Sequence, residues 1–324
     1  MSCNSLINSK LRLPNHNLPI KLMHNIKCNF DKICQTIKAL DLDIFGQDGN
    51  IPKAGLNPQF SDLEVISLSL TAEYMSLDSE NWLFNKIKSD YANDFPHLIE
   101  RSRFNRRRRQ LFPILEKIRQ SLARHFLEFE EYFIVDSMPL EVCRITREKR
   151  AKVCKESFET APAKGFCASQ NLHFFGYKLQ GICSANGIFH SIELTKANIH
   201  DTTFLKEFNT QLSDCVLLGD KGYLSSSLQL DLFHTANIKL ETPMRINQKN
   251  YRKQDWIFRK TRKRIETLFS QLCDQFMIRR NYAKSFDGFK TRILSKVTAL
   301  TIIQFINKFQ FNRSVNNLKV PLTN

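Results

Sequence analysis

The sequence predicts an α/β protein, with a mixed β-sheet flanked by helices and a helical region before it. Two short apolar runs, Tyr132–Val135 and Val216–Leu218, have the length and β-branched content of strands that are buried on both faces. Apolar and polar side chains alternate on either side of Asn186-Gly187, which predicts an antiparallel hairpin from about residue 173 to 194. Before residue 128 the apolar residues recur instead at helical spacing.

The composition indicates a polyanionic partner. The 324 residues include 48 Lys and Arg against 32 Asp and Glu, a net charge of +16, which is typical of proteins that bind nucleic acid or an anionic membrane surface. We expect no membrane insertion, because the longest apolar-rich run, 297–306, is too short to span a bilayer. No signal peptide is evident, and no Gly-rich phosphate loop is present.

The cysteines favour a reducing compartment. There are nine, an odd number, without any C-x-x-C pair, so we expect reduced thiols in a cytoplasmic protein. A zinc site formed by Cys154, Cys167 and His173 is conceivable, but these residues lack paired-ligand spacing, and ordinary buried thiols are the better interpretation.

Residues 1–128 are expected to form a helical, DNA-binding region. Residues 1 to about 30 are polar and predict a loosely ordered lead-in, followed by a helix over 30–42. Ser61 and Glu64 have the spacing of a capping box that begins a helix. Further on, six arginines surround Phe104 and predict phosphate contacts in a helix-turn-helix-like element, although a solvated basic face is the alternative. They are Arg101, Arg103, Arg106, Arg107, Arg108 and Arg109.

Two aspartates follow the apolar strands. Asp136 is predicted to lie where the first strand stops, at the rim of the sheet where ligands bind in open α/β folds; a simple turn residue before Pro139 is the alternative. Asp220 repeats this design after Val216–Leu218. Between them we expect an irregular insertion over 151–170 and a helix from Asp201, as its capping residue, to Leu212. A short strand is expected over 238–241.

A third acid, Glu266, lies on a predicted amphipathic helix behind a basic run. Residues 245–264 contain nine basic residues and one acid, and Ile265, Leu268 and Leu272 then recur on one helical face. Arg259, Arg262, Lys263 and Arg264 are candidate DNA contacts, while a surface ion pair between Arg262 and Glu266 is the plainer interpretation. A buried helix is expected over 287–309, and residues 311–324 are expected to form a dispensable tail.

Together the three acids form a candidate metal centre. Carboxylate oxygens suit Mg²⁺, and two such ions about 4 Å apart can activate an oxygen nucleophile and stabilise the leaving oxygen of a phosphodiester. Asp136, Asp220 and Glu266 are therefore the predicted metal-binding and catalytic residues.

Six motifs then point to one family. F-I-V-D-S-M-P, F-G-Y-K-L, L-T-K-A-N-I-H-D, L-L-G-D-K-G-Y, I-K-L-E-T-P-M-R and R-K-R-I-E-T-L-F-S-Q-L occur in this order. They resemble the bacterial insertion-sequence DDE transposases, specifically the insertion-sequence-982 family within the insertion-sequence-4-like DDE superfamily. The resemblance covers about residues 60–309.

This resemblance implies a ribonuclease-H-like catalytic domain, which we place at residues 129–310. It also implies binding of the terminal inverted repeats, strand cleavage and strand transfer, with Asp136, Asp220 and Glu266 as the catalytic triad. Two Mg²⁺ (or Mn²⁺) ions, double-stranded DNA of element ends and target, and a homo-oligomer assembled on DNA complete the expectation. The protein would be cytoplasmic, and nucleoid-associated when bound to DNA.

One departure from the wider superfamily leaves the third acid open. A Tyr, Arg, Glu, Lys signature often surrounds it; Arg262 and Glu266 match, but Arg259 replaces the Tyr and Cys273 the Lys. Glu241 is therefore a rival third acid. Two other functions also stay open: a transposase-derived DNA-binding protein without catalysis, and a two-metal nuclease without strand transfer.

Overall fold

The computed structural model describes residues 25–40, 42–207, 212–248 and 251–322. Its first part is helical, with α2 (Ile26–Lys38), α3 (Asp62–Tyr74), α4 (Glu80–Asp90), α5 (Arg101–Gln110) and α6 (Phe112–Arg124). Most of the predicted N-terminal lead-in lies outside the described residues. The helix expected from residue 30 begins earlier, because the Asn25 side chain accepts a hydrogen bond from the Cys28 amide and caps α2.

Two helix boundaries have clear local causes. The predicted capping box is confirmed, because the Ser61 hydroxyl accepts from the Glu64 amide and the Glu64 carboxylate accepts from the Ser61 amide. The arginine run forms α5, and a break at Leu111 separates it from α6, which has Pro113 in its first turn.

The sheet is mixed, as predicted. Its strand order is β2 (Ala163–Cys167), β3 (Leu172–Ser184), β1 (Tyr132–Cys143), β5 (Cys215–Leu218) and β6 (Ile238–Glu241), and β4 (Phe189–Lys196) also pairs with β3. β1 is antiparallel to β3 and parallel to β5, and β5 is parallel to β6. Short 3₁₀ turns cover Leu127–Phe129, Ile145–Arg147, Ala168–Gln170 and Lys221–Tyr223.

The prediction that the first strand stops at Asp136 is wrong, because β1 runs on to Cys143 beside β3. Pro139 does not end it. The Tyr132 carbonyl faces β3 and the Glu131 carbonyl faces β5. The backbone N–H and C=O groups of odd-numbered residues in β1 therefore point away from β3, toward the side of β5. β5 pairs with β1 only as far as Ile134, so Pro139 directs its missing N–H toward a side without a strand partner, where proline is tolerated.

The hairpin prediction is confirmed, since β3 and β4 are antiparallel and Gly187 has a φ of +91° in the turn. The insertion over 151–170 is not wholly irregular, because Ala163–Cys167 forms β2 on the edge of β3. Its sequence, A-K-G-F-C, lacks the alternation that identifies a strand.

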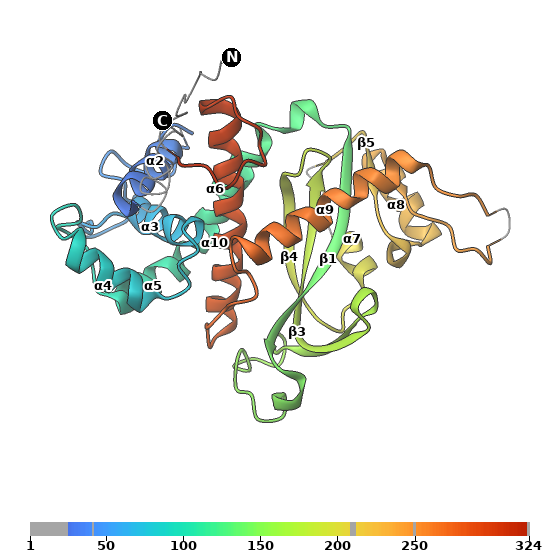
Figure 1. Ribbon diagram of the computed structural model, residues 1–324, viewed down its shortest axis with the longest axis horizontal. Helices are drawn as coiled ribbons and strands as arrows, with labels where there is room; N and C mark the ends of the chain where they lie inside the picture. Colours follow the sequence, from blue (N-terminus) through green and yellow to red (C-terminus); the bar gives the residue numbers. More distant parts are fainter. Residues whose placement is uncertain (1–24, 41, 208–211, 249–250, 323–324) are drawn as a thin grey trace, which may run out of the picture.

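Helices cover both faces of the sheet (Figure 1). Helices α7 (Asp201–Glu207) and α8 (Ser226–Ala236) enclose one core with residues such as Phe133 and Val135. On the other face, α9 (Trp256–Asp274) and α10 (Phe286–Phe305) share a core with Ile134 and the N-terminal helices. Asp201 does not cap α7 as predicted; His200 does, through its ring Nδ1, which accepts from the Thr202 amide at 3.2 Å. The predicted end of this helix, at 208–211, lies outside the described residues.

The last helix is buried on most of its circumference, as predicted, and continues as a π-helical turn over Ile306–Gln310. It packs between the sheet and helices α3 and α6, so the helical region and the sheet share one continuous core (Figure 1). That the tail is dispensable stays a prediction, although its described residues pack against the rest of the chain. Leu318 and Leu322 are buried in this core, and the Val320 carbonyl accepts a hydrogen bond from the Tyr74 hydroxyl at 3.1 Å. In the described ranges we find no helix with the length and apolar content that a membrane span requires.

Candidate active site

Asp136, on β1, and Asp220, two residues after the end of β5, lie near each other, since the charge of Asp220 acts on Asp136. β1 and β5 are paired in parallel with Tyr132 opposite Val216 and Ile134 opposite Leu218. The structure therefore brings together two acids that are far apart in the sequence.

The Asp136 carboxylate is on the face of the sheet that α9 covers. Ile134 and Met138 belong to the core beneath α9, and side chains two residues apart in a strand share a face. Asp136 lies between these two residues on β1, so its side chain is on the same face.

The environment of Asp136 penalises its ionised form. Burial is the main reason that its pKa is raised to about 7, and the negative charges of Asp220 and Asp201 act in the same direction. The Ser137 amide, which donates to Asp136 Oδ1 at 2.7 Å, and the positive charge of Arg262 oppose this shift only in part. A cation placed between the two aspartates would relieve this penalty.

Asp220 is held by its own turn. Its Oδ1 accepts a hydrogen bond from the Gly222 amide at 2.7 Å, which begins the 3₁₀ turn that follows β5. A Cβ at Gly222 would lie 2.9 Å from Asp220 Oδ1, so any larger residue at this position would have to displace the carboxylate. The G-D-K-G-Y segment therefore fixes the direction of the Asp220 carboxylate.

Behind the sheet lies a polar network around Asp201 that sequence reasoning did not assign to the site. Asp201 Oδ1 accepts from Lys178 Nζ at 2.6 Å, from Gln180 Nε2 at 2.9 Å and from the Ser137 hydroxyl at 3.2 Å. Burial would raise the pKa of Asp201, but these hydrogen bonds and the charge of Lys178 outweigh it and lower the pKa below its ordinary value. Asp201 is therefore a charged structural partner of Lys178.

This network also reaches the Asp220 turn. The buried Tyr223 hydroxyl donates to Gln180 Oε1 at 3.2 Å, so the turn is tied to β3 and through Gln180 to Asp201. The alternation of β3 could have pointed to this role, because it places polar Lys178 and Gln180 on the face opposite Tyr177 and Leu179.

Glu266 lies on α9, one turn after Arg262, with an exposed side chain. The charge of Arg262 acts on Asp136, which shows that this part of α9 lies near the two aspartates. No ion pair joins Arg262 to Glu266 in the described residues. Glu241, the rival, is opposite Leu218 in the sheet and forms an ion pair with Lys239 at 2.8 Å.

The described residues contain no group of three His, Cys, Asp or Glu side chains close enough to hold a metal ion. The conceivable zinc site at Cys154, Cys167 and His173 is therefore not formed. The Asp136 and Asp220 pair still suits Mg²⁺, which proteins often hold through one or two carboxylates together with water and substrate phosphate. The penalty on ionised Asp136, to which burial and the charge of Asp220 contribute, is the feature that a divalent cation would remove.

The predicted DNA contacts on α5 divide into two groups. Arg107 and Arg108 are buried: Arg107 binds Asp62 at 2.6 Å and the Phe60 carbonyl at 2.5 Å, and Arg108 binds Glu80 at 2.7 Å. Both guanidinium groups hold α5 against the preceding helices. Arg101, Arg103 and Arg106 are exposed and Arg109 is half-buried.

The basic residues of α9 divide similarly. Arg259 and Lys263 are exposed and Arg262 is half-buried. Arg264 contacts the tail through the Asn316 side chain, and a Cβ at Gly187 would lie 2.2 Å from its Nε. Arg264 therefore joins the β3–β4 turn to the C-terminal segment, and burial lowers its pKa.

Comparison with known proteins identifies one family. Residues 128–302 match the family model described as a transposase DDE domain. No curated protein and no solved structure matches the chain. The matched segment covers more than half of the chain and contains β1 with Asp136, the turn after β5 with Asp220, and α9 with Glu266.

Proposed function

Because this chain belongs to the transposase DDE-domain family, we propose that it binds the ends of an insertion sequence and cleaves a DNA phosphodiester bond at Asp136 and Asp220. The observation that carries this proposal is the placement of Asp136 on β1 and of Asp220 two residues after β5, the parallel neighbour of β1, with Asp136 penalised by burial and by the charge of Asp220. Carboxylates held together at such a cost are typical of sites that bind a cation.

Asp136 and Asp220 would hold the divalent metal, Mg²⁺ or Mn²⁺, with Glu266 as the third acid. Bound there, the metal supplies Lewis acidity to the oxygens of the scissile phosphate. The turn after Asp220 and the Ser137 amide orient the two carboxylates, and Arg262 lies where it can neutralise charge beside them. Glu266 is preferred to Glu241 because α9 also brings Arg262 to Asp136, whereas Glu241 is already paired with Lys239.

The finer assignment rests on the motifs and on charge. The proposal includes the insertion-sequence-982 family, a ribonuclease-H-like catalytic domain at 129–310, strand transfer by the freed 3′-hydroxyl, and assembly as a homo-oligomer on DNA in the cytoplasm. The mixed sheet, with β1 antiparallel to β3 and parallel to β5, supports the fold assignment. The net charge of +16 supports a double-stranded DNA partner.

The test is cleavage of a duplex that contains an element end, with Mg²⁺. Asp136→Asn and Asp220→Asn are expected to reduce cleavage to background, and Asp231→Asn, an exposed aspartate on α8, serves as the matched control. Glu266→Gln should behave like the aspartate variants and Glu241→Gln like the control. Cleavage by both aspartate variants at the parental rate would refute the metal assignment.

A second assay separates the remaining functions. If pre-cut ends are supplied, a transposase joins them to target DNA, whereas a nuclease without strand transfer leaves them unjoined. A parent protein that binds end-containing DNA but neither cuts nor joins it would instead be a DNA-binding protein without catalysis.

A further inference from the structure

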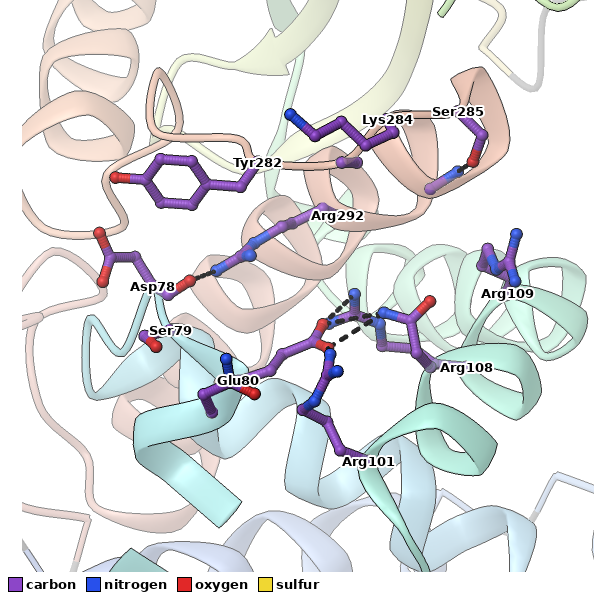
Figure 2. A pocket seen from close by; sticks show the side chains of 14 residues that line it. Asp78, Ser79, Glu80, Arg101, Arg108, Arg109, Tyr282, Lys284, Ser285 and Arg292 are labelled. Atoms are coloured by element: carbon purple, nitrogen blue, oxygen red, sulfur yellow. Dashed lines mark hydrogen bonds and ion pairs between the residues drawn. The ribbon is translucent and has the colours of Figure 1, made fainter. Parts of the chain in front are cut away.

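A basic pocket lies apart from the two aspartates. Its volume is about 710 Å³, and α4, α5 and the segment that begins α10 form its walls (Figure 2). None of its lining residues comes from β1, β5 or α9. The pocket is therefore a separate feature of the helical side of the molecule.

The lining is strongly basic. Five basic side chains face two acidic ones, Asp78 and Glu80; the basic residues are Arg101, Arg108, Arg109, Lys284 and Arg292. Their charges come from helices and a loop that are distant in the sequence, so the concentration of charge is a product of the fold. Such a pocket favours an anion.

Acidic side chains neutralise only part of this charge, since Glu73, outside the lining, pairs with Arg292 at 3.4 Å. Glu80 already binds Arg108 at 2.7 Å and is 3.9 Å from Arg101, as Figure 2 shows. Asp78 is 3.8 Å from Arg280, outside the pocket lining. In the part of the chain that the structure describes, neither Arg109 nor Lys284 has an ion-pair partner.

Three guanidinium groups that line this pocket have an Nε without a hydrogen-bond partner in the described structure, those of Arg108, Arg109 and Arg292; the Arg292 Nε lies 3.4 Å from Glu73 Oε1. All three Nε atoms are buried from solvent. Arg108 is only 7% exposed as a residue, so water cannot readily replace the missing acceptor. A buried charged donor without an acceptor is unfavourable, and a negative charge held in the pocket would stabilise these guanidinium groups.

The start of α10 adds little by itself, because it is already capped. The Ser285 hydroxyl accepts from the Gly288 amide at 3.2 Å, and the Glu156 carboxylate accepts from the Phe286 amide. The attraction for an anion therefore comes from the arginine and lysine side chains. Arg109 lies against this helix end, since its Cδ is 4.0 Å from the position of a Cβ on Gly288.

We propose that this pocket binds one phosphate group of the DNA backbone, with Arg109 and Lys284 as its principal contacts and Arg108 as a buried donor. A phosphate offers several charged acceptor oxygens, which suits guanidinium groups that converge from different elements. The identity of the ligand as DNA rests on the proposed function, whereas the affinity of the pocket for phosphate does not.

The test measures equilibrium binding of a 30-base-pair duplex without divalent metal, so that cleavage plays no part. Arg109→Ala and Lys284→Ala are each expected to weaken binding about tenfold and to reduce the salt slope of the logarithm of the affinity by about 1. Lys88→Ala is the matched control, because Lys88 is exposed on the last turn of α4, away from the pocket. Lys284 is exposed, so its variant keeps the test available if Arg109→Ala does not fold.

A second arm uses inorganic phosphate alone. Phosphate should raise the melting temperature of the parent and of Lys88→Ala more than that of Arg109→Ala or Lys284→Ala. If both pocket variants bind the duplex as tightly as Lys88→Ala does, the proposal is refuted. If phosphate nevertheless raises the melting temperature of the parent more than that of the pocket variants, the pocket binds a free anion instead of DNA.

Failure of this proposal differs from failure of the proposed function. A parent that cuts DNA, with pocket variants that bind like the control, would remove the pocket and leave the nuclease assignment intact. Weaker binding by both pocket variants, in a chain that never cuts DNA, would support the pocket and remove the catalytic assignment.

Discussion

Replacing Asp136 by Asn should make the metal-free protein more stable above pH 7 while abolishing DNA cleavage. Burial, together with the charges of Asp220 and Asp201, raises the pKa of Asp136 to about 7 from an ordinary value of 3.8. The folded protein therefore binds more protons than the unfolded chain between these values, and stability falls as the pH rises from about 4 to about 7. Asn keeps an oxygen that can accept from the Ser137 amide but carries no charge.

The size of the stability gain follows from the pKa shift of Asp136. A shift of about three pKa units corresponds to roughly 4 kcal/mol of unfolding free energy. We expect about 2 kcal/mol, because Asp136 is only half-buried and water screens part of the penalty. The gain of Asp136→Asn over the parent should therefore be small near pH 4 and reach its full value above pH 7.

Urea unfolding in EDTA across this pH range measures the difference, with Asp231→Asn as the control for an exposed carboxylate. Addition of Mg²⁺ should then stabilise the parent more than the variant, because a ligand that binds only the folded state stabilises it. A stability difference that does not change with pH, or an Asn variant less stable than the parent at pH 8, would refute this account of the site.

Two further predictions concern the junction between the helical region and the sheet. Arg119→Met should lower the free energy of unfolding by about 3 kcal/mol, because Arg119 is 1% exposed and donates to the Phe189 and His190 carbonyls. Urea unfolding measures this loss, with Arg124→Met, at an exposed position on the same helix, as the control. Equal losses of stability in both variants would contradict the prediction. Burial, with help from Arg119, lowers the pKa of His190 to about 4, so the folded state binds fewer protons than the unfolded chain and stability should fall as the pH drops from about 6.5 to 4. His190→Leu should flatten this part of the pH profile, and an unchanged profile would contradict the prediction.

Local patterns predicted much of the catalytic half. Alternation and apolar runs identified β1, β3, β4, β5 and β6, because the period of side chains along a strand is a property of neighbouring residues. β2 was missed because its five residues do not alternate; its position on the edge of β3 depends on pairing alone. The predicted end of β1 was also wrong because of strand pairing. β1 can continue through Pro139 because β5 pairs with β1 only as far as Ile134, which leaves no strand partner beside the proline nitrogen.

The sequence alone predicted Asp136, Asp220 and Glu266 as the acids of the candidate site, with Glu241 as a rival for the third, because the motifs around these residues are local. Only the tertiary structure decided that Asp136 and Asp220 lie near each other, because the parallel pairing of β1 with β5 brings these distant segments together and the charge of Asp220 then acts on Asp136. It also divided the arginines of α5: Arg107 and Arg108 are buried because their acidic partners arrive from α3 and α4, tens of residues earlier. An ion pair between distant segments produces no periodic pattern in the sequence. The function of each arginine in residues 101–109 therefore depends on tertiary packing and not on its position in that segment.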